Sequence, residues 1–287
     1  MMSSMSPTVV AARAGLSRGW IEFRQQLTNR EDVFNMIFPA IIFLVVMIFM
    51  RGSSIPGTNI SLGTMTVPSV LGAGVMFSGM LGMAGVLAVE REDGTLLRAK
   101  ATPNGMLGYL VGKVLSVSGA AVVGMLLTLI PSLFLFDGLA TGGLGSWLGL
   151  LWVLVFGLVA TMPVGAVLGS LTTNARNLGL IMLPVLGLGA ISGVFYPITA
   201  MPDWLQVVAQ VFPMYWLGLG MRSALLPVDA VAVEIGQSWR HLETLGVLGV
   251  WAVIGLVLAP IVLRRMARRE SGSSVAARRE KAMQRVG

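Results

Sequence analysis

The chain has 287 residues, of which 55% are hydrophobic and 11% are charged, and its mean hydropathy is +0.82. A soluble domain of this length cannot bury so much apolar surface, so the composition predicts a membrane protein. The chain has no cysteine and one histidine, which excludes disulfides, thiolate metal sites, cysteine nucleophiles and histidine metal clusters. The net charge of +7 must be interpreted by where the charges lie.

Residues 1–32 contain no apolar run of signal-peptide type, so we expect the N-terminus to stay in the cytoplasm. From Val9 to Leu27, apolar side chains recur every three or four residues, and arginines lie off that stripe. This pattern predicts an amphipathic helix, either on an anionic membrane surface with Trp20 among the headgroups or packed on the protein.

Six apolar runs are long enough to be membrane spans. They cover residues 33–50, 66–89, 114–136, 147–171, 178–196 and 244–263. With this arrangement, seventeen Lys and Arg residues lie on one side and three on the other, which predicts both termini in the cytoplasm. We therefore expect a cytoplasmic segment over 1–32, a membrane domain over 33–263 and a basic, disordered tail over 264–287. The tail suits acidic lipids better than nucleic acid, because it lacks interleaved aromatic residues.

Small residues recur every fourth position in three of the spans, which favours close helix packing or a sliding or subunit interface. The three stripes are Gly74, Ser78 and Gly82; Ser116, Ala120, Gly124 and Thr128; and Gly157, Thr161, Gly165 and Gly169.

The six predicted spans have no charged residue or histidine in their interiors, which disfavours an ion-coupled carrier and an intramembrane hydrolase. Residues 108–114 are the nearest approach to a phosphate-binding loop, but their glycines are too closely spaced and Val114 replaces the Ser or Thr. We therefore expect no ATP site and no enzymatic activity in this chain. Lys113 is interpreted as a headgroup anchor at the cytoplasmic end of the third span.

A dense charged segment, residues 90–103, lies between the second and third predicted spans. Three acids precede Arg98 and Lys100, the order that complements a helix dipole, and residues 102–105 contain stop signals. The charges alone fit either a short helix or a cytoplasmic loop whose charges only determine the orientation of the chain in the membrane. The run Glu-Arg-Glu-x-Gly-Thr-Leu followed by Thr-Pro resembles the corresponding loop in permease subunits of ABC-2-type exporters, including the daunorubicin-resistance-type drug and lipid exporters.

The resemblance implies that this segment is a coupling helix that docks on a separate ATPase subunit. It assigns polar contacts to the first three residues, a turn to the glycine and packing in a groove of the ATPase to the leucine. The residues concerned are Glu90, Arg91, Glu92, Gly94, Thr95 and Leu96.

The connection before the last span resembles the external segment of the same family, in which short helices re-enter the outer leaflet. The residues that carry this resemblance are Ser192, Gly193, Tyr196, Pro197, Pro202, Trp204, Pro213 and Arg222. Arg222 is interpreted as a headgroup anchor or a pore-mouth residue, and Asp203 as a helix cap. We expect His241 to lie at the outer interface.

The fold class that follows is an all-α polytopic membrane protein with six transmembrane helices. The resemblance implies a permease subunit in the cell membrane that exports a drug, an antibiotic or a lipid. ATP and Mg would bind to two partner ATPase subunits, and a second permease would complete a homodimer or heterodimer. Soft, apolar side chains of the second and fifth spans are candidates for the wall of a pathway, although any one of them is more often a lipid-facing or packing residue. They are Met76, Met80, Met83, Leu186 and Phe195. The alternatives are a membrane-protein assembly factor and, with less support, an ion-coupled carrier.

Overall fold

The computed structural model describes residues 6–55, 60–172 and 178–269. Two helices precede the first long core helix: α1 (Pro7–Thr28) and α2 (Arg30–Met50). Asn29 separates them, and its side chain caps α2 by accepting a hydrogen bond from the backbone N–H of Glu31 at 3.1 Å. The other elements, in chain order, are α3 (Leu62–Met76), the π-helical turn η1 (Phe77–Gly82), α4 (Met83–Glu92), α5 (Thr95–Lys100), α6 (Gly105–Leu135), α7 (Leu144–Leu171), α8 (Leu178–Ile191), η3 (Ile198–Ala200), α9 (Asp203–Val211), α10 (Pro213–Leu225), η4 (Val228–Val233), η5 (Ile235–Gln237) and α11 (His241–Arg269).

Five of the described helices are long and apolar enough to cross a membrane. They are α2, the continuous helix α3–η1–α4, α6, α7 and α11. The fifth predicted span coincides with α8, which has 14 residues and is therefore about 21 Å long. That length is short of a typical crossing, so an all-α membrane protein is confirmed while the sixth span stays a prediction.

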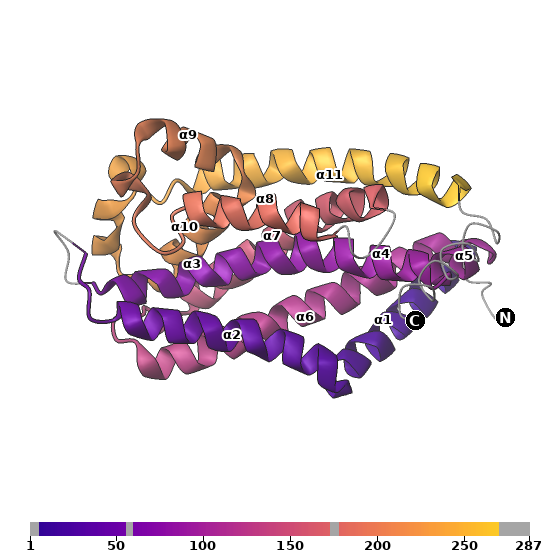
Figure 1. Ribbon diagram of the computed structural model, residues 1–287, viewed down its shortest axis with the longest axis horizontal. Coiled ribbons are helices and arrows are strands. Elements are labelled where there is room, and N and C mark those ends of the chain that lie inside the picture. Colours follow the sequence, from indigo (N-terminus) through magenta and orange to yellow (C-terminus); the bar gives the residue numbers. More distant parts are fainter. Residues whose placement is uncertain (1–5, 56–59, 173–177, 270–287) are drawn as a thin grey trace, which may run out of the picture.

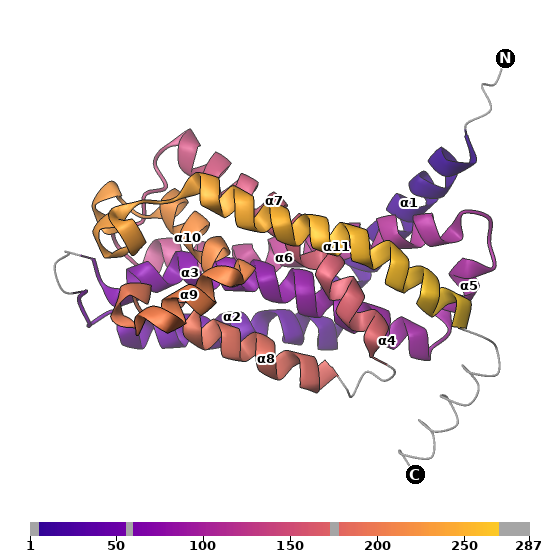
Figure 2. The ribbon, with the colours of Figure 1, turned by 90° about the horizontal axis from the view of Figure 1, so that it is seen from above.

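The start of α1, the short helix α5 and the end of α11 lie at one end of the bundle, and α9 and α10 lie at the other (Figures 1 and 2). This is the arrangement expected for two cytoplasmic termini and an outer segment of short helices. We refer to these as the coupling end and the outer end.

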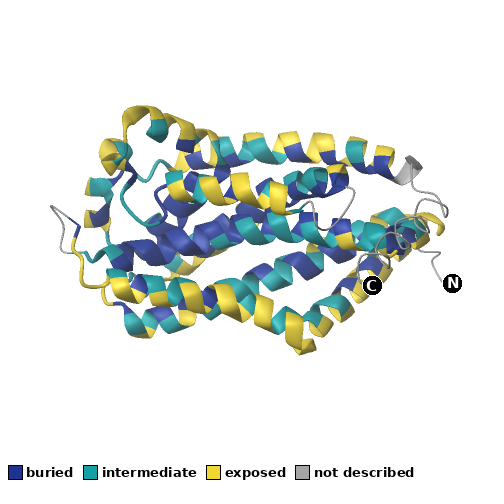
Figure 3. Cartoon of the chain, in the orientation of Figure 1, coloured by how far each residue is buried: buried dark blue, intermediate teal, exposed yellow. Residues whose placement is uncertain are grey.

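The most buried helices are α3 and α10, which Figure 3 shows in dark blue between more exposed neighbours. α10 lies against α3 and α7. Close approach there depends on Gly72, because a side chain at that position would meet the backbone of α10 at 2.6 Å. The outward faces of α2, α7 and α11 remain apolar and exposed, as expected for helices that contact lipid.

Candidate functional site

The charged segment after the second span forms two elements rather than one helix. α4 continues to Glu92, and Gly94 then adopts a left-handed conformation with φ of +79°, which ends the helix. The carboxylate of Asp93 accepts a hydrogen bond from the backbone N–H of Thr95 at 2.7 Å and so starts α5. The expected turn at Gly94 is observed, but Glu90 and Glu92 end the long helix instead of beginning the short one.

One side of α5 packs into the protein. Leu96 is 1% exposed and belongs to the main core, together with Ala99. The expectation that Leu96 packs in a groove of a partner is therefore wrong for this conformation, because its own chain already encloses it. The opposite side, with Arg98, Lys100 and residues 101–104, is exposed.

Two charged residues before the turn are also engaged within the chain. Arg91 donates hydrogen bonds from Nη1 to the carbonyl oxygens of Ser170 and Thr172 at 3.2 and 2.8 Å. These bonds tie the end of α4 to the end of α7. The side chains of Arg91 and Glu90 thus stabilise the coupling end from inside, whereas Glu92 is half-buried beside it.

A buried charge cluster joins α1, α4 and α6 at the coupling end. Nζ of Lys113 lies 2.6 Å from Oε2 of Glu22 and 2.5 Å from Oε1 of Glu90. Arg18 pairs with the other oxygen of Glu22 at 2.8 Å, and Lys113 lies 5.5 Å from the ring centre of Tyr109. The interpretation of Lys113 as a headgroup anchor is wrong, since α6 begins two turns earlier and the side chain is 4% exposed.

The cluster also sets the ionisation of Glu22. Burial by itself would raise the pKa of this carboxyl. Hydrogen bonds from Lys113 and Arg18 outweigh that effect and hold the pKa of Glu22 below its usual value. The ion pairs therefore favour the charged form that ties α1 to α6.

Glycines bring α1 into direct backbone contact with α6. A Cβ atom added at Gly15 would lie 2.2 Å from the carbonyl oxygen of Gly108, and one added at Gly19 would lie 2.4 Å from that of Gly112. No other residue allows this approach. Most of the predicted apolar stripe of α1 points away from the protein, with Trp20 53% exposed, whereas Phe23 packs against Gly119 of α6. α1 therefore docks by one face and presents the other for lipid.

A second buried charge pair closes the outer end. Arg222 of α10 donates from Nε and Nη2 to the carboxylate of Glu234 at 2.6 and 3.1 Å, and from Nη1 to the hydroxyl of Ser69 at 2.9 Å. Both ionic side chains are 1% exposed. The headgroup-anchor interpretation of Arg222 is therefore wrong: it fixes the outer segment to α3 by a fully paired guanidinium.

The other expected residues of the outer segment shape its turns. Ser192 is buried and bonds to the carbonyl of Leu188, Gly193 has φ of +66°, and the hydroxyl of Tyr196 bonds to the carbonyl of Ala190. Pro197, Pro202 and Pro213 stand at the starts of η3, α9 and α10, while Trp204 is exposed. The cap assigned to Asp203 is wrong, because this residue is the first of α9 and makes no side-chain cap bond. His241 begins α11 at the outer end, as expected.

The residues expected along a pathway are not gathered in one place. Met76, Met80 and Met83 are buried in the main core on the side of the long helix that faces α7. Leu186 is exposed on α8, and Phe195 stacks at 6.4 Å on Phe43 of α2.

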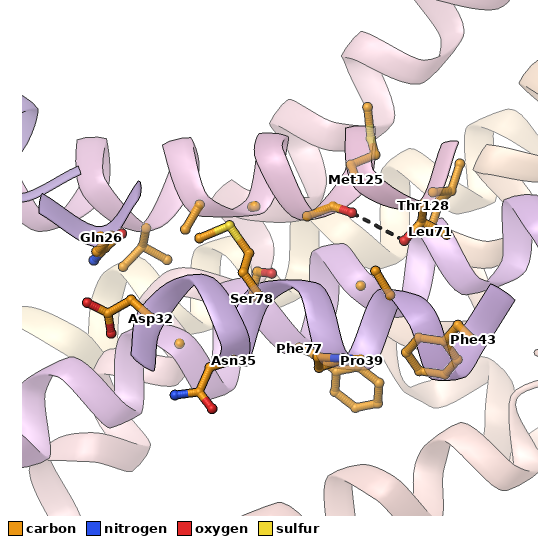
Figure 4. A pocket seen from close by; sticks show the side chains of 18 of the residues that line it. Gln26, Asp32, Asn35, Pro39, Phe43, Leu71, Phe77, Ser78, Met125 and Thr128 are labelled. Carbon is orange, nitrogen blue, oxygen red and sulfur yellow. Dashed lines mark hydrogen bonds between the residues drawn. The ribbon is translucent and has the colours of Figure 1, made fainter. Parts of the chain in front are cut away.

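A groove of about 420 Å³ lies instead on the opposite side of the long helix, between α2, α3–α4 and α6 (Figure 4). Its wall is mostly apolar and includes Phe43, Leu71, Phe77 and Met125. At one end, Gln26 and Asp32 lie close together in the view of Figure 4.

Two of the three small-residue stripes line this groove and do not pack closely. A Cβ atom added at Gly74 or at Gly124 would meet nothing within 4 Å. The third stripe does pack: a Cβ atom at Gly165 would lie 2.3 Å from the carbonyl oxygen of Met80, and one at Gly169 would lie 2.7 Å from that of Ala84. The interpretation as packing devices is confirmed for α7 alone.

Among the residues that the structure describes, no group of three or more His, Asp or Glu side chains could hold a metal ion. The described site therefore consists of an exposed coupling end, a buried charge cluster behind it and an apolar groove.

The sequence pattern of a known family, described as ABC-2 family transporter protein, matches residues 28–261. The chain belongs to this family. A search of curated proteins found no match to the ABC-2 chain. ABC-2 permeases normally work with an ABC ATPase and lack an ATPase site of their own.

Several residues of the site in this ABC-2 protein were not predicted from its sequence. Glu22 and Glu234 were not identified: Glu22 is the one acid among residues 1–30, whereas Glu234 lies between Asp229 and Glu243 and has no such signal. Gln26 and Asp32 carry no sequence signal that distinguishes them from ordinary polar residues at helix ends, and Ser69 none that distinguishes it from other small residues inside a span.

Proposed function

We propose that this chain is the permease subunit of an ATP-driven exporter in the cell membrane, and that it moves a lipophilic or amphiphilic substrate out of the cytoplasm. The family match supports a transport permease. The observation that carries the finer proposal is the short helix α5, which projects at the coupling end with Arg98, Lys100 and residues 101–104 exposed.

In this proposal the ATPase docks on the exposed side of α5 and at the exposed Asp93, while the buried residues Gly94 and Thr95 hold the turn behind that surface. Leu96 fixes the opposite side to the core, so a push on α5 reaches α4 and α6 directly. Arg91 connects α4 directly to the end of α7, and Glu90 connects α4 to Lys113 of α6, which in turn bonds to Glu22 of α1. Glu92 lies at the edge of this surface and would contact the ATPase. The internal charges thus make the coupling end one rigid body.

Two ATPase subunits, each with ATP and Mg, and a second permease as homodimer or heterodimer partner complete the proposed complex. The apolar face of α8 is unpaired within the described chain, with Leu180, Leu183 and Leu186 exposed. It suits either lipid or the second permease. A pathway between two permeases would also account for why Met76, Met80, Met83 and Phe195 are not gathered in one place within the described part of the chain. The proposed cargo classes are drugs, antibiotics and lipids, and the proposed role is efflux, resistance or lipid export.

The experiment is purification of the tagged chain from its native membrane in mild detergent, with bound proteins identified by mass spectrometry. Ala101→Trp places a large side chain on the exposed coupling surface, and Gly142→Trp places the same side chain at the exposed outer end. Both positions are exposed, so both variants should fold. We expect an ABC ATPase with the unchanged chain and with Gly142→Trp, and strong loss with Ala101→Trp. Absence of any ATPase from the folded, unchanged chain in several detergents would refute the proposal.

A further inference from the structure

We infer that the groove between α2, α3–α4 and α6 binds a protonated, lipophilic amine, with its ammonium group at Asp32 and Gln26 and its apolar body along the groove. This inference rests on the proposed export function, because it identifies the cargo class. It concerns a cavity within one chain rather than a pathway between two permeases.

The charge of the ligand follows from the polar end of the groove. Within the described part of the chain, no hydrogen bond or ion pair reaches the carboxylate of Asp32. Oε1 of Gln26 is buried without a hydrogen-bond partner. Both groups are acceptors: the Gln26 oxygen is buried, and a buried acceptor without a partner costs about 1–3 kcal/mol, while Asp32 is half-buried and adds a negative charge at the mouth of the groove. A ligand that donates N–H bonds and carries positive charge would satisfy both.

The apolar body of the ligand follows from the rest of the wall. Between Asp32 and Phe43, α2 extends for about 16 Å. Over this length the groove presents apolar side chains such as Leu71, Phe77 and Met125. The hydroxyl of Thr128 already donates a hydrogen bond to the carbonyl oxygen of Gly124 in its own helix, so it does not need a polar group of the ligand as a partner. A cavity of about 420 Å³ falls in the usual range for small-molecule sites.

The open space beside Gly74 and Gly124, inside the groove, indicates a ligand site rather than a packing defect. Two facing stripes of glycine and small residues leave space at Gly74 and Gly124, where helices in lipid otherwise approach closely. The π-helical turn that begins at Phe77 widens the long helix at the same level, and such turns are frequent at functional sites.

The same charges disfavour an anionic membrane phospholipid. Its phosphate would stand next to the carboxylate of Asp32, and two like charges in a partly buried site repel each other. A simple amine with a single positive charge has no such conflict. The groove therefore selects for net positive charge.

The test uses the full chain in nanodiscs, without ATP or ATPase, and three photoreactive probes that share one alkyl chain: dodecylamine, dodecanol and dodecanoate, each with a diazirine on the chain. Labelled peptides are identified by mass spectrometry. We expect the amine to label α2 and α6 around the groove, and unlabelled dodecylamine to compete. Labelling by the other two probes should be about tenfold weaker, the loss expected when a charged hydrogen bond is absent.

Two pairs of variants make the result specific. Asp32→Asn should lower labelling by the amine about tenfold, whereas Glu31→Gln, at the exposed neighbouring acid, should leave it unchanged. Gly124→Leu should fill the groove and remove labelling. Gly249→Leu adds the same side chain on α11, where space is equally open, and should have no effect.

Equal labelling by the three probes, labelling led by the carboxylate, or labelling that survives both Asp32→Asn and Gly124→Leu would overturn the inference. None of these results bears on the ATPase partner, because binding is measured without it. Co-purification of the ATPase with Asp32→Asn would show that the proposed function stands even if the amine site does not exist.

Discussion

Replacing Lys113 by methionine should destabilise the coupling end more than any change on its surface. The methionine keeps most of the side-chain volume but removes the positive charge that lies 2.6 Å from Glu22 and 2.5 Å from Glu90. Removal of one partner from a buried ion pair costs about 3–5 kcal/mol. Glu22 keeps Arg18 at 2.8 Å, but Glu90 keeps only a distant contact with Arg18 at 3.9 Å. We therefore expect a loss near the lower limit, about 3 kcal/mol, caused mainly by Glu90.

The loss can be measured as the change in the free energy of unfolding when the chain is titrated with SDS in detergent micelles, followed by tryptophan fluorescence. The double variant Lys113→Met with Glu90→Gln should recover most of the stability, because no uncompensated carboxylate remains. Lys100→Met, at an exposed lysine of α5, is the matched control and should cost less than about 1 kcal/mol. A loss below about 1 kcal/mol for Lys113→Met, or no recovery in the double variant, would refute the reasoning.

Three further predictions concern other parts of the structure. Gly165→Ala would place a Cβ atom 2.3 Å from a backbone oxygen of η1 and should cost about 1–3 kcal/mol, whereas Gly124→Ala meets nothing and should be neutral or slightly stabilising in the same SDS titration. Arg222→Leu leaves the buried Glu234 unpaired and should cost about 3–5 kcal/mol, most of which Glu234→Gln in the same chain should restore; stability unchanged by Arg222→Leu would contradict the buried pair. Because the pKa of Glu22 is lowered in the folded chain, its stabilisation is present above the unfolded-state pKa and is lost as the pH falls through the folded value. The SDS midpoint should therefore change little from about pH 7 to about pH 5 and fall as the pH is lowered further, and it should fall less for Glu22→Gln; equal pH dependence of the two chains would argue against this contribution.

Composition and local pattern were sufficient to predict the class of fold. Long apolar runs predicted the helices of the bundle, because lipid requires each crossing segment to satisfy its own backbone hydrogen bonds. The turn at Gly94 followed from glycine, and the exposed apolar stripe that includes Trp20 followed from its spacing.

The roles of individual charged residues could not be predicted, because they depend on partners that are distant in the sequence. Lys113 lies 91 positions from Glu22, and Arg222 lies 153 positions from Ser69. At the end of an apolar run, a lysine or arginine that anchors to headgroups looks the same as one that pairs inside the protein. The stripes of small residues were ambiguous for the same reason. Their spacing shows that one face of a helix consists of small residues, but the position of the neighbouring helix decides whether the space beside that face is occupied.

The most direct test of the central claim is a cross-link between α5 and the ATPase. The chain contains no cysteine, so Ala101→Cys creates a unique attachment point for a photoreactive benzophenone on the exposed coupling end, and Gly142→Cys does the same at the outer end. In native membranes the account predicts that the probe at position 101 cross-links to an ABC ATPase and that the probe at position 142 does not. Cross-linking from neither position, or only from position 142, would contradict the assignment of α5 as the docking element.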